Sequence, residues 1–222
     1  IVLNNQRIFD YSDAELLPES GEIEFIDFDG NGVFDENDTV KITSYTNIVV
    51  NSVDASRQII FDKYTDYSNP DSEDYSINLQ NINEYKIHDN HGDEYGLNEL
   101  REWDVLAVMQ TPDKDYAEIT LVDECAGGKL ESIGSTDDGE TCLKIGGKQY
   151  PVSENFRGDL SKFICGNDVT VYWDLYGKVT AIENGIASYA EKNESTASQQ
   201  NELTDKLVIV SGYAMDKEEN EV

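Results

Sequence analysis

The chain has 222 residues, enough for one large domain or two modest ones that each bury a core. Its 46 acidic and 16 basic side chains give a formal net charge of −30. Such an acidic surface repels phosphate backbones and anionic lipid headgroups, which argues against nucleic acid as a partner and against direct membrane insertion. The sequence has no apolar run long enough to span a bilayer and no pattern typical of a secretory leader.

The first informative segment is the twelve-residue stretch from Asp27 to Asp38. Oxygen-bearing side chains occupy its first, third, fifth, ninth and twelfth positions, and Gly32 stands at the sixth. Calcium takes about six to eight oxygen ligands, and this spacing supplies them where a glycine lets the backbone turn sharply. The predicted calcium ligands are the side chains of Asp27, Asp29, Asn31, Asp35 and Asp38 and the carbonyl of Val33. A plain polar turn is the alternative, because Asp, Asn and Gly are also ordinary turn residues.

Strand-like runs surround this loop and continue through the first half of the chain. We predict strands at 22–26 and 39–43 on its two sides, unlike the helices that flank an EF-hand. A hairpin is predicted at 46–53 and 58–61, followed by a polar surface loop at 64–74. The remaining predictions are a hairpin of 84–88 and 94–97 around the turn 89–93, one or two helical turns at 97–103, a central strand at 105–109 and a strand at 117–122.

After a predicted break at 123–128, similar hairpin signals return. Strands are predicted at 129–133, 142–145, 149–152, 169–173 and 178–182, about the number in a small barrel. The pair Gly146-Gly147 suits a turn with positive φ. From 184 to 205 the composition is dominated by Ala, Ser, Glu, Asn and Gln, which is typical of a linker or a loose helix. One more strand is predicted at 206–214.

These patterns predict an all-β protein with two small antiparallel modules that resemble barrels or sandwiches. The first module is expected at 1–124 and the second at 125–183. Residues 184–222 are expected to hold the polar linker and the start of a further strand.

Little in the sequence points to catalysis. His88 and His91 are the two histidines, and at a predicted turn two solvated side chains are more common than a transition-metal site. No Ser or Cys stands in a nucleophile-elbow pattern, and no phosphate-binding glycine loop is present. With 46 acidic residues, carboxylates at a glycosidase-like separation would occur by chance. We therefore expect no enzyme activity.

Aromatic residues and cysteines leave alternatives open. Four aromatic side chains could stack on sugar rings, although packing is the more common role of Trp and Tyr in strands: Trp103, Tyr172, Trp173 and Tyr176. The three cysteines, Cys125, Cys142 and Cys165, form no CxxC pair. They could make one disulfide and one free thiol, or be three small buried residues. We expect none of them to be catalytic or to bind zinc.

Six short motifs follow one another along residues 1–183. They are LLPESG at 16–21, YTNIVVNSVD at 45–54, IFDKY at 60–64, LREWDVL at 100–106, IGGKQY at 145–150 and WDLYGKVTA at 173–181. Their order resembles a repeated region of large cell-surface proteins of Clostridia and related Firmicutes, which often carry S-layer homology domains elsewhere. The resemblance implies export, a wall-associated location and a structural or spacer role, and it implies no catalytic residues. The chain departs from the family by an insertion at 36–38 and by its three cysteines.

The sequence therefore predicts a non-catalytic cell-surface or cell-wall module with a structural, spacer or adhesion role, stabilised by calcium. Its partner would be a cell-wall polymer or another surface protein. A carbohydrate-binding module that uses exposed Trp and Tyr is the first alternative, and an enzyme of unknown class is the second. The oligomeric state stays open.

Overall fold

The computed structural model describes residues 1–12, 16–18, 20–33, 35–36, 38–136, 138–187 and 209–210. Within these residues, helical structure with defined bounds consists of short 3₁₀ helices: η2 (Leu79–Asn81), η3 (Leu97–Glu99) and η4 (Leu160–Lys162). Strands make up the rest of the regular structure, so the predicted all-β class is confirmed. No helix in the described part of the chain is long and apolar enough to cross a bilayer.

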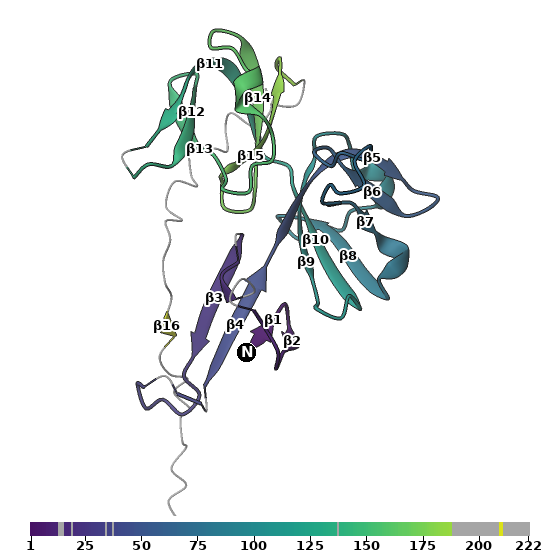
Figure 1. Ribbon diagram of the computed structural model, residues 1–222, viewed down its shortest axis with the longest axis vertical. Coiled ribbons are helices and arrows are strands. Elements are labelled where there is room, and N and C mark those ends of the chain that lie inside the picture. The colour runs from purple at the N-terminus through teal and green to yellow at the C-terminus, as the bar shows by residue number, and fades with distance from the viewer. Residues whose placement is uncertain are drawn as a thin grey trace, which may run out of the picture.

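The first sheet is a narrow arm that carries the acidic loop (Figure 1). Its order is β16-β3-β4-β1-β2. The strands are β1 (Val2–Leu3), β2 (Gln6–Arg7), β3 (Gly21–Ile26), β4 (Thr39–Ser44) and β16 (Ile209–Val210). β3 and β4 form an antiparallel hairpin in which Ile26 lies opposite Thr39, so the predicted strands on both sides of the loop are confirmed.

The second sheet has six strands in the order β7-β6-β5-β9-β10-β8. They are β5 (Thr46–Asp54), β6 (Ile59–Asp62), β7 (Ile77–Asn78), β8 (Glu84–Asp89), β9 (Val105–Gln110) and β10 (Tyr116–Val122). The apolar run at 105–109 is a central strand, as predicted, because β9 lies between β5 and β10. Only Tyr45 separates β4 from β5, so one extended segment, 39–54, contributes to both sheets.

The third sheet has five strands in the order β13-β12-β11-β14-β15. They are β11 (Cys125–Ser135), β12 (Thr141–Ile145), β13 (Lys148–Pro151), β14 (Asp168–Trp173) and β15 (Val179–Asn184). The sheet is not closed into the barrel that was predicted. Its outer strands, β13 and β15, meet only near one isolated bridge, Val152 to Val179, because the chain turns at 154–155 directly after that bridge.

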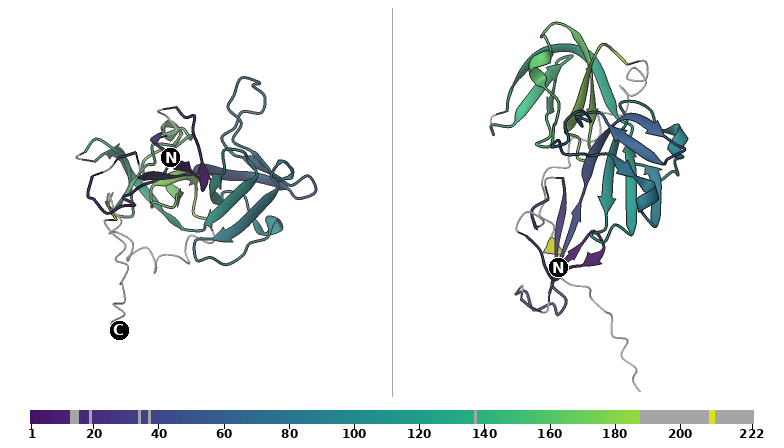
Figure 2. Two further views of the ribbon diagram at one scale, coloured as in Figure 1. Left: turned by 90° about the horizontal axis from the view of Figure 1, so that it is seen from below. Right: turned by 45° about the vertical axis from the view of Figure 1, so that its right-hand side comes forward.

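Three clusters of buried apolar side chains lie within or between these sheets. The largest fills one face of the second sheet and includes Ile48, Leu106 and Ile119. Another lies inside the curved third sheet around Leu143 and Val171. The third joins the two sheets through Val49, Val105, Val122, Cys125, Tyr172 and Ala181. In both figures these two sheets adjoin each other, and the acidic loop lies at the far end of the arm (Figure 2).

Two predicted elements were wrong in detail. Residues 94–97 are not the second strand of a hairpin, because β8 pairs in parallel with β10 and meets 94 only in a single bridge between His88 and Glu94. The predicted break at 123–128 is shorter, since β11 already begins at Cys125. Not all pairing is antiparallel either: β1 with β4, β8 with β10 and β16 with β3 are parallel.

The module bounds 1–124 and 125–183 stay a prediction. The third sheet runs from Cys125 to Asn184, and the residues before it build the second sheet and four strands of the first. The predicted linker at 184–222 lies mostly outside the described residues. Of the strand predicted at 206–214, the structure describes Ile209–Val210 as β16.

Candidate metal centre

The acidic loop closes the β3–β4 hairpin, and its sharp bends rest on two glycines. Gly30 has φ 67° and Gly32 has φ 76°, in the left-handed region that glycine adopts without a steric penalty. These bends direct backbone N–H groups inward, toward the carboxylates of the same loop. The loop therefore forms a set of local hydrogen bonds rather than an open turn.

Asp27 accepts two of these hydrogen bonds. Its Oδ1 accepts from the Gly30 N–H at 2.8 Å and its Oδ2 from the Gly32 N–H at 2.9 Å. The hydrogen bond from Gly32 is the main reason why the pKa of the Asp27 carboxyl lies below its usual value. Asp27 is thus held as a carboxylate, the form that binds a hard cation.

Asp29 and Asp38 are fixed in the same way. Asp29 accepts from the backbone N–H of Asn31 at 3.0 Å and from its Nδ2 at 2.8 Å. Asp38 joins the two ends of the loop, because its Oδ1 accepts from the Phe28 N–H at 3.0 Å and its Oδ2 from the Asp35 N–H at 2.7 Å. The twelfth position is therefore built into the loop despite the insertion at 36–38.

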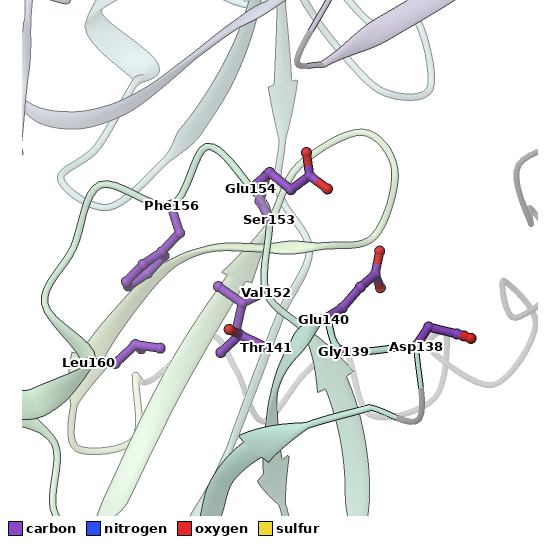
Figure 3. Close-up of a pocket in the computed structure, with 9 residues that line it drawn as sticks. All are labelled: Asp138, Gly139, Glu140, Thr141, Val152, Ser153, Glu154, Phe156 and Leu160. Atoms are coloured by element: carbon purple, nitrogen blue, oxygen red, sulfur yellow. The ribbon is translucent and has the colours of Figure 1, made fainter.

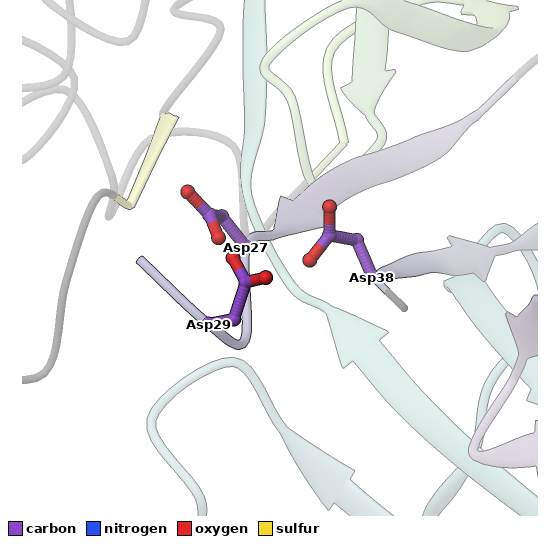
Figure 4. A group of neighbouring side chains, drawn as sticks. All are labelled: Asp27, Asp29 and Asp38. Carbon is purple, nitrogen blue, oxygen red and sulfur yellow. The ribbon is translucent and has the colours of Figure 1, made fainter. Parts of the chain in front are cut away.

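These bonds bring three of the predicted ligands together. Carboxylate oxygens of Asp27, Asp29 and Asp38 all lie within 4.8 Å of one another, and Figure 4 shows the three side chains converging at the end of the hairpin. Like charges at such separations repel, and a divalent cation between them would remove that repulsion. The arrangement fits a hard, oxygen-ligated cation, with water completing the shell.

Of the other three predicted ligands, Asp35 is not one of the grouped carboxylates, and Asn31 and Val33 take part in hydrogen bonds of the loop. Asn31 uses its Oδ1 to accept from the Val33 N–H at 2.6 Å, and Val33 itself is 62 % exposed. Asp35 contributes its backbone N–H to Asp38, while its carboxylate is outside the group. Asp27, Asp29 and Asp38 therefore form the grouped carboxylates, while the role of Asn31, Val33 and Asp35 as ligands stays a prediction.

The histidines and cysteines form no comparable cluster in the part of the chain that the structure describes. His88 lies in β8 rather than in a turn, and its Nε2 is 2.9 Å from Oε1 of Glu118. All three cysteines are free thiols, with Cys125 and Cys142 buried and Cys165 exposed. Neither a disulfide nor a set of three buried residues is what the structure shows.

The four aromatic residues considered for sugar stacking are engaged in packing to different degrees. Tyr172 and Trp173 are buried, and Trp173 stacks on Tyr150 with ring centroids 5.8 Å apart. Trp103 is half-buried and stacks on Tyr172, which leaves Tyr176 as the most exposed of the four, at 38 %. Their arrangement supports a packing role more than a flat binding platform.

An open hollow of about 500 Å³ lies on the third sheet. Phe156 and Leu160 line one side, and Asp138 and Glu140 lie toward the other, as Figure 3 shows. Glu140 is already paired with the Lys178 ammonium at 3.3 Å. The lining contains Ser153, Thr141 and three acidic residues, and no His, Cys or basic side chain.

Comparisons of the chain with family models, with curated proteins and with solved structures gave no match. The interpretation of the acidic loop therefore rests on its own residues and geometry.

Proposed function

We propose that the chain is a non-catalytic module of a bacterial cell-surface protein, with a structural, spacer or adhesion role, and that calcium stabilises it. The observation that carries the proposal is the convergence of Asp27, Asp29 and Asp38 at the tip of the β3–β4 hairpin. Extracellular modules commonly use calcium at such loops with affinities of about 10⁻⁴–10⁻³ M, which suits the concentration outside cells.

The connectivity of the hairpin supports a structural role for the ion. The segment 39–54 contributes β4 to the arm and β5 to the second sheet. An ion that fixes the loop would therefore fix the start of a strand that continues into the second sheet. The flanking strands β16 and β1 each pair with only two residues of the β3–β4 ribbon, and β4 has one buried residue, Ile42, so the ribbon itself contributes little stability. An ion at the tip would hold the free end of the ribbon together.

The calcium part of the proposal is tested by calorimetry of the whole chain in millimolar calcium and in excess chelator. The parent is expected to melt several degrees higher with calcium, and Asp29→Asn to lose that difference. Asp71→Asn, which removes an exposed carboxylate outside the loop, is the matched control and should keep it. Identical melting curves of the parent in calcium and in chelator would refute calcium stabilisation.

The proposed location on the cell surface needs a separate measurement. Antibodies against the chain should label intact cells of the source organism, and labelling only after lysis would contradict the location. A glycan array tests the carbohydrate-binding alternative, and a specific sugar that loses binding in Tyr176→Ala would favour it.

A further inference from the structure

The segment between β13 and β14 reaches from the third sheet onto the second. At its centre, Arg157 donates from Nη1 to Oδ2 of Asp62 and from Nη2 to Oδ1 of Asp62, both at 2.7 Å. Asp62 belongs to β6 of the second sheet and is completely buried. The two residues thus form a bidentate ion pair across the boundary between sheets, 95 positions apart in sequence.

Further contacts of Arg157 lie on the second sheet and on the loop at 63–76 that joins β6 to β7. Its Nη2 donates to the Asn47 carbonyl at 2.7 Å. Its guanidinium carbon lies 3.9 Å from the ring centroid of Tyr75 and 5.8 Å from that of Tyr64. A planar guanidinium with three hydrogen bonds and two aromatic neighbours has one favourable orientation, which an apolar contact does not impose.

Asp62 also accepts hydrogen bonds from residues of its own part of the chain. It accepts from the Val49 N–H at 3.1 Å, the Tyr64 N–H at 2.8 Å and the Thr65 hydroxyl at 3.2 Å. The carboxylate therefore cannot turn to another partner without breaking the start of the 63–76 loop. Without Arg157 it would be a buried charge that lacks a counterion, which is strongly unfavourable.

We propose that Arg157 is a strap that locks the third sheet onto the second in one orientation, so that the two sheets form a single rigid and cooperative unit. Apolar packing around Val49 and Tyr172 holds the sheets together, and the Arg157–Asp62 pair determines how they are aligned. Only Asp123 and Glu124 connect β10 of the second sheet to β11 of the third, so the link between the two sheets is also very short. The inference does not depend on calcium or on a surface location.

Spin labels on the whole chain test the orientation. The exposed Cys165, three residues before β14 of the third sheet, provides one labelling site and Lys86→Cys on β8 the other, while Cys125 and Cys142 are buried. We expect a narrow distance distribution in the otherwise unchanged chain and a broader or shifted one after Arg157→Met. Arg57→Met, which removes an exposed arginine from its ion pair with Asp54, is the matched control and should leave the distribution narrow.

Calorimetry supplies the second readout. Arg157→Met is expected to lower the melting temperature by roughly 6–15 °C, because it strands the Asp62 carboxylate, and to separate the single transition into two. Asp62→Asn combined with Arg157→Met removes the stranded charge, so it should recover part of the loss while the labels still report a broad distribution. A narrow, parent-like distribution in either Arg157 variant, or a melting temperature equal to that of Arg57→Met, would overturn the proposal.

Discussion

Trp103 and Tyr172 stack across the boundary between the second and third sheets, with ring centroids 5.9 Å apart and planes inclined by 6°. Trp103 precedes β9, and Tyr172 lies in β14, where its hydroxyl group donates to Glu183. The Lys63 ammonium lies 3.9 Å from the centroid of the Trp103 ring. To hold the ring in this place, the backbone of Trp103 adopts φ 77°, which is unfavourable for any residue with a Cβ.

Two variants of Trp103 separate the stability contributed by ring packing from the stability lost to backbone strain. Trp103→Ala loses the stacking but keeps the Cβ, and we expect it to lower the free energy of unfolding by about 2–4 kcal/mol. Trp103→Gly loses the same ring but relieves the left-handed strain, so it should be more stable than the alanine variant by about 1 kcal/mol. Denaturant unfolding of the two variants measures the difference, and a less stable glycine variant would argue against strain.

A second prediction concerns Asp104, next in sequence to Trp103. Burial raises the pKa of its carboxyl to about 6, and the nearby charge of Asp123 acts in the same direction. Because the unfolded pKa is about 3.9, the folded state binds the proton more tightly, and this group makes the fold less stable as pH rises from about 4 to 6. Above pH 6 the penalty is constant, and below pH 4 it is absent.

Asp104→Asn should remove that penalty and still accept the hydrogen bond from the Arg101 N–H. Because Asp104 is only partly buried and solvent screens its charge, we expect a gain of about 1–2 kcal/mol in the free energy of unfolding at pH 8 and none near pH 4. Urea titrations of parent and variant at both pH values test this. An equal difference at the two pH values would show that ionisation is not its cause.

The strands that could be predicted from the sequence are those indicated by their own residues and by the turn residues beside them. Gly146 and Gly147 turn β12 into β13 with φ 56° and 84°, as their dipeptide indicates. Gly127 and Gly128 are also a glycine dipeptide, yet they form no turn: they lie inside β11 and pair with β14. The reason is distant in sequence: a Cβ on Gly128 would lie 2.9 Å from Cγ2 of Ile145, so glycine is needed there for close packing.

The remaining differences between the predictions and the structure depend on contacts between residues far apart in the sequence. The residues of β8 indicate a strand, but they do not reveal that its neighbour is β10 rather than the adjacent segment 94–97. In the acidic loop, the spacing located Asp27, Asp29 and Asp38, whereas the roles of Asn31 and Asp35 depend on which N–H groups the folded backbone presents. Nothing local distinguishes Arg157 or Asp62 from other charged residues.

The cysteines should differ sharply in reactivity. Burial, together with the charges of Asp123 and Glu183, raises the pKa of the Cys125 thiol to about 11, so its thiolate is scarce at neutral pH. Cys142 is buried as well, whereas Cys165 is exposed. Mass spectrometry after alkylation of the folded chain should find one modified thiol, absent in Cys165→Ser, and all three after denaturation. Rapid modification of Cys125 in the folded state would contradict this.

The last prediction concerns which cation the acidic loop selects. Asp27, Asp29 and Asp38 are held mainly by backbone N–H groups of a short exposed loop, so a bound ion would complete its shell with water and flexible ligands. Calcium accepts such an irregular shell, whereas magnesium requires near-octahedral geometry and gives up its water reluctantly. We therefore expect calcium to raise the melting temperature more than magnesium does at the same millimolar concentration.

The size of the effect follows from linkage. An ion that binds only the folded state adds RT ln(1 + [L]/Kd), which is about 1 kcal/mol when calcium is several-fold above its Kd. For a chain of this size that corresponds to a rise of about 2–4 °C. Asp27→Asn and Asp38→Asn should each abolish the rise, and His91→Ala, a change at an exposed turn far from the loop in sequence, should preserve it. Equal stabilisation by magnesium and calcium would show that the loop attracts cations by charge alone, without selecting calcium.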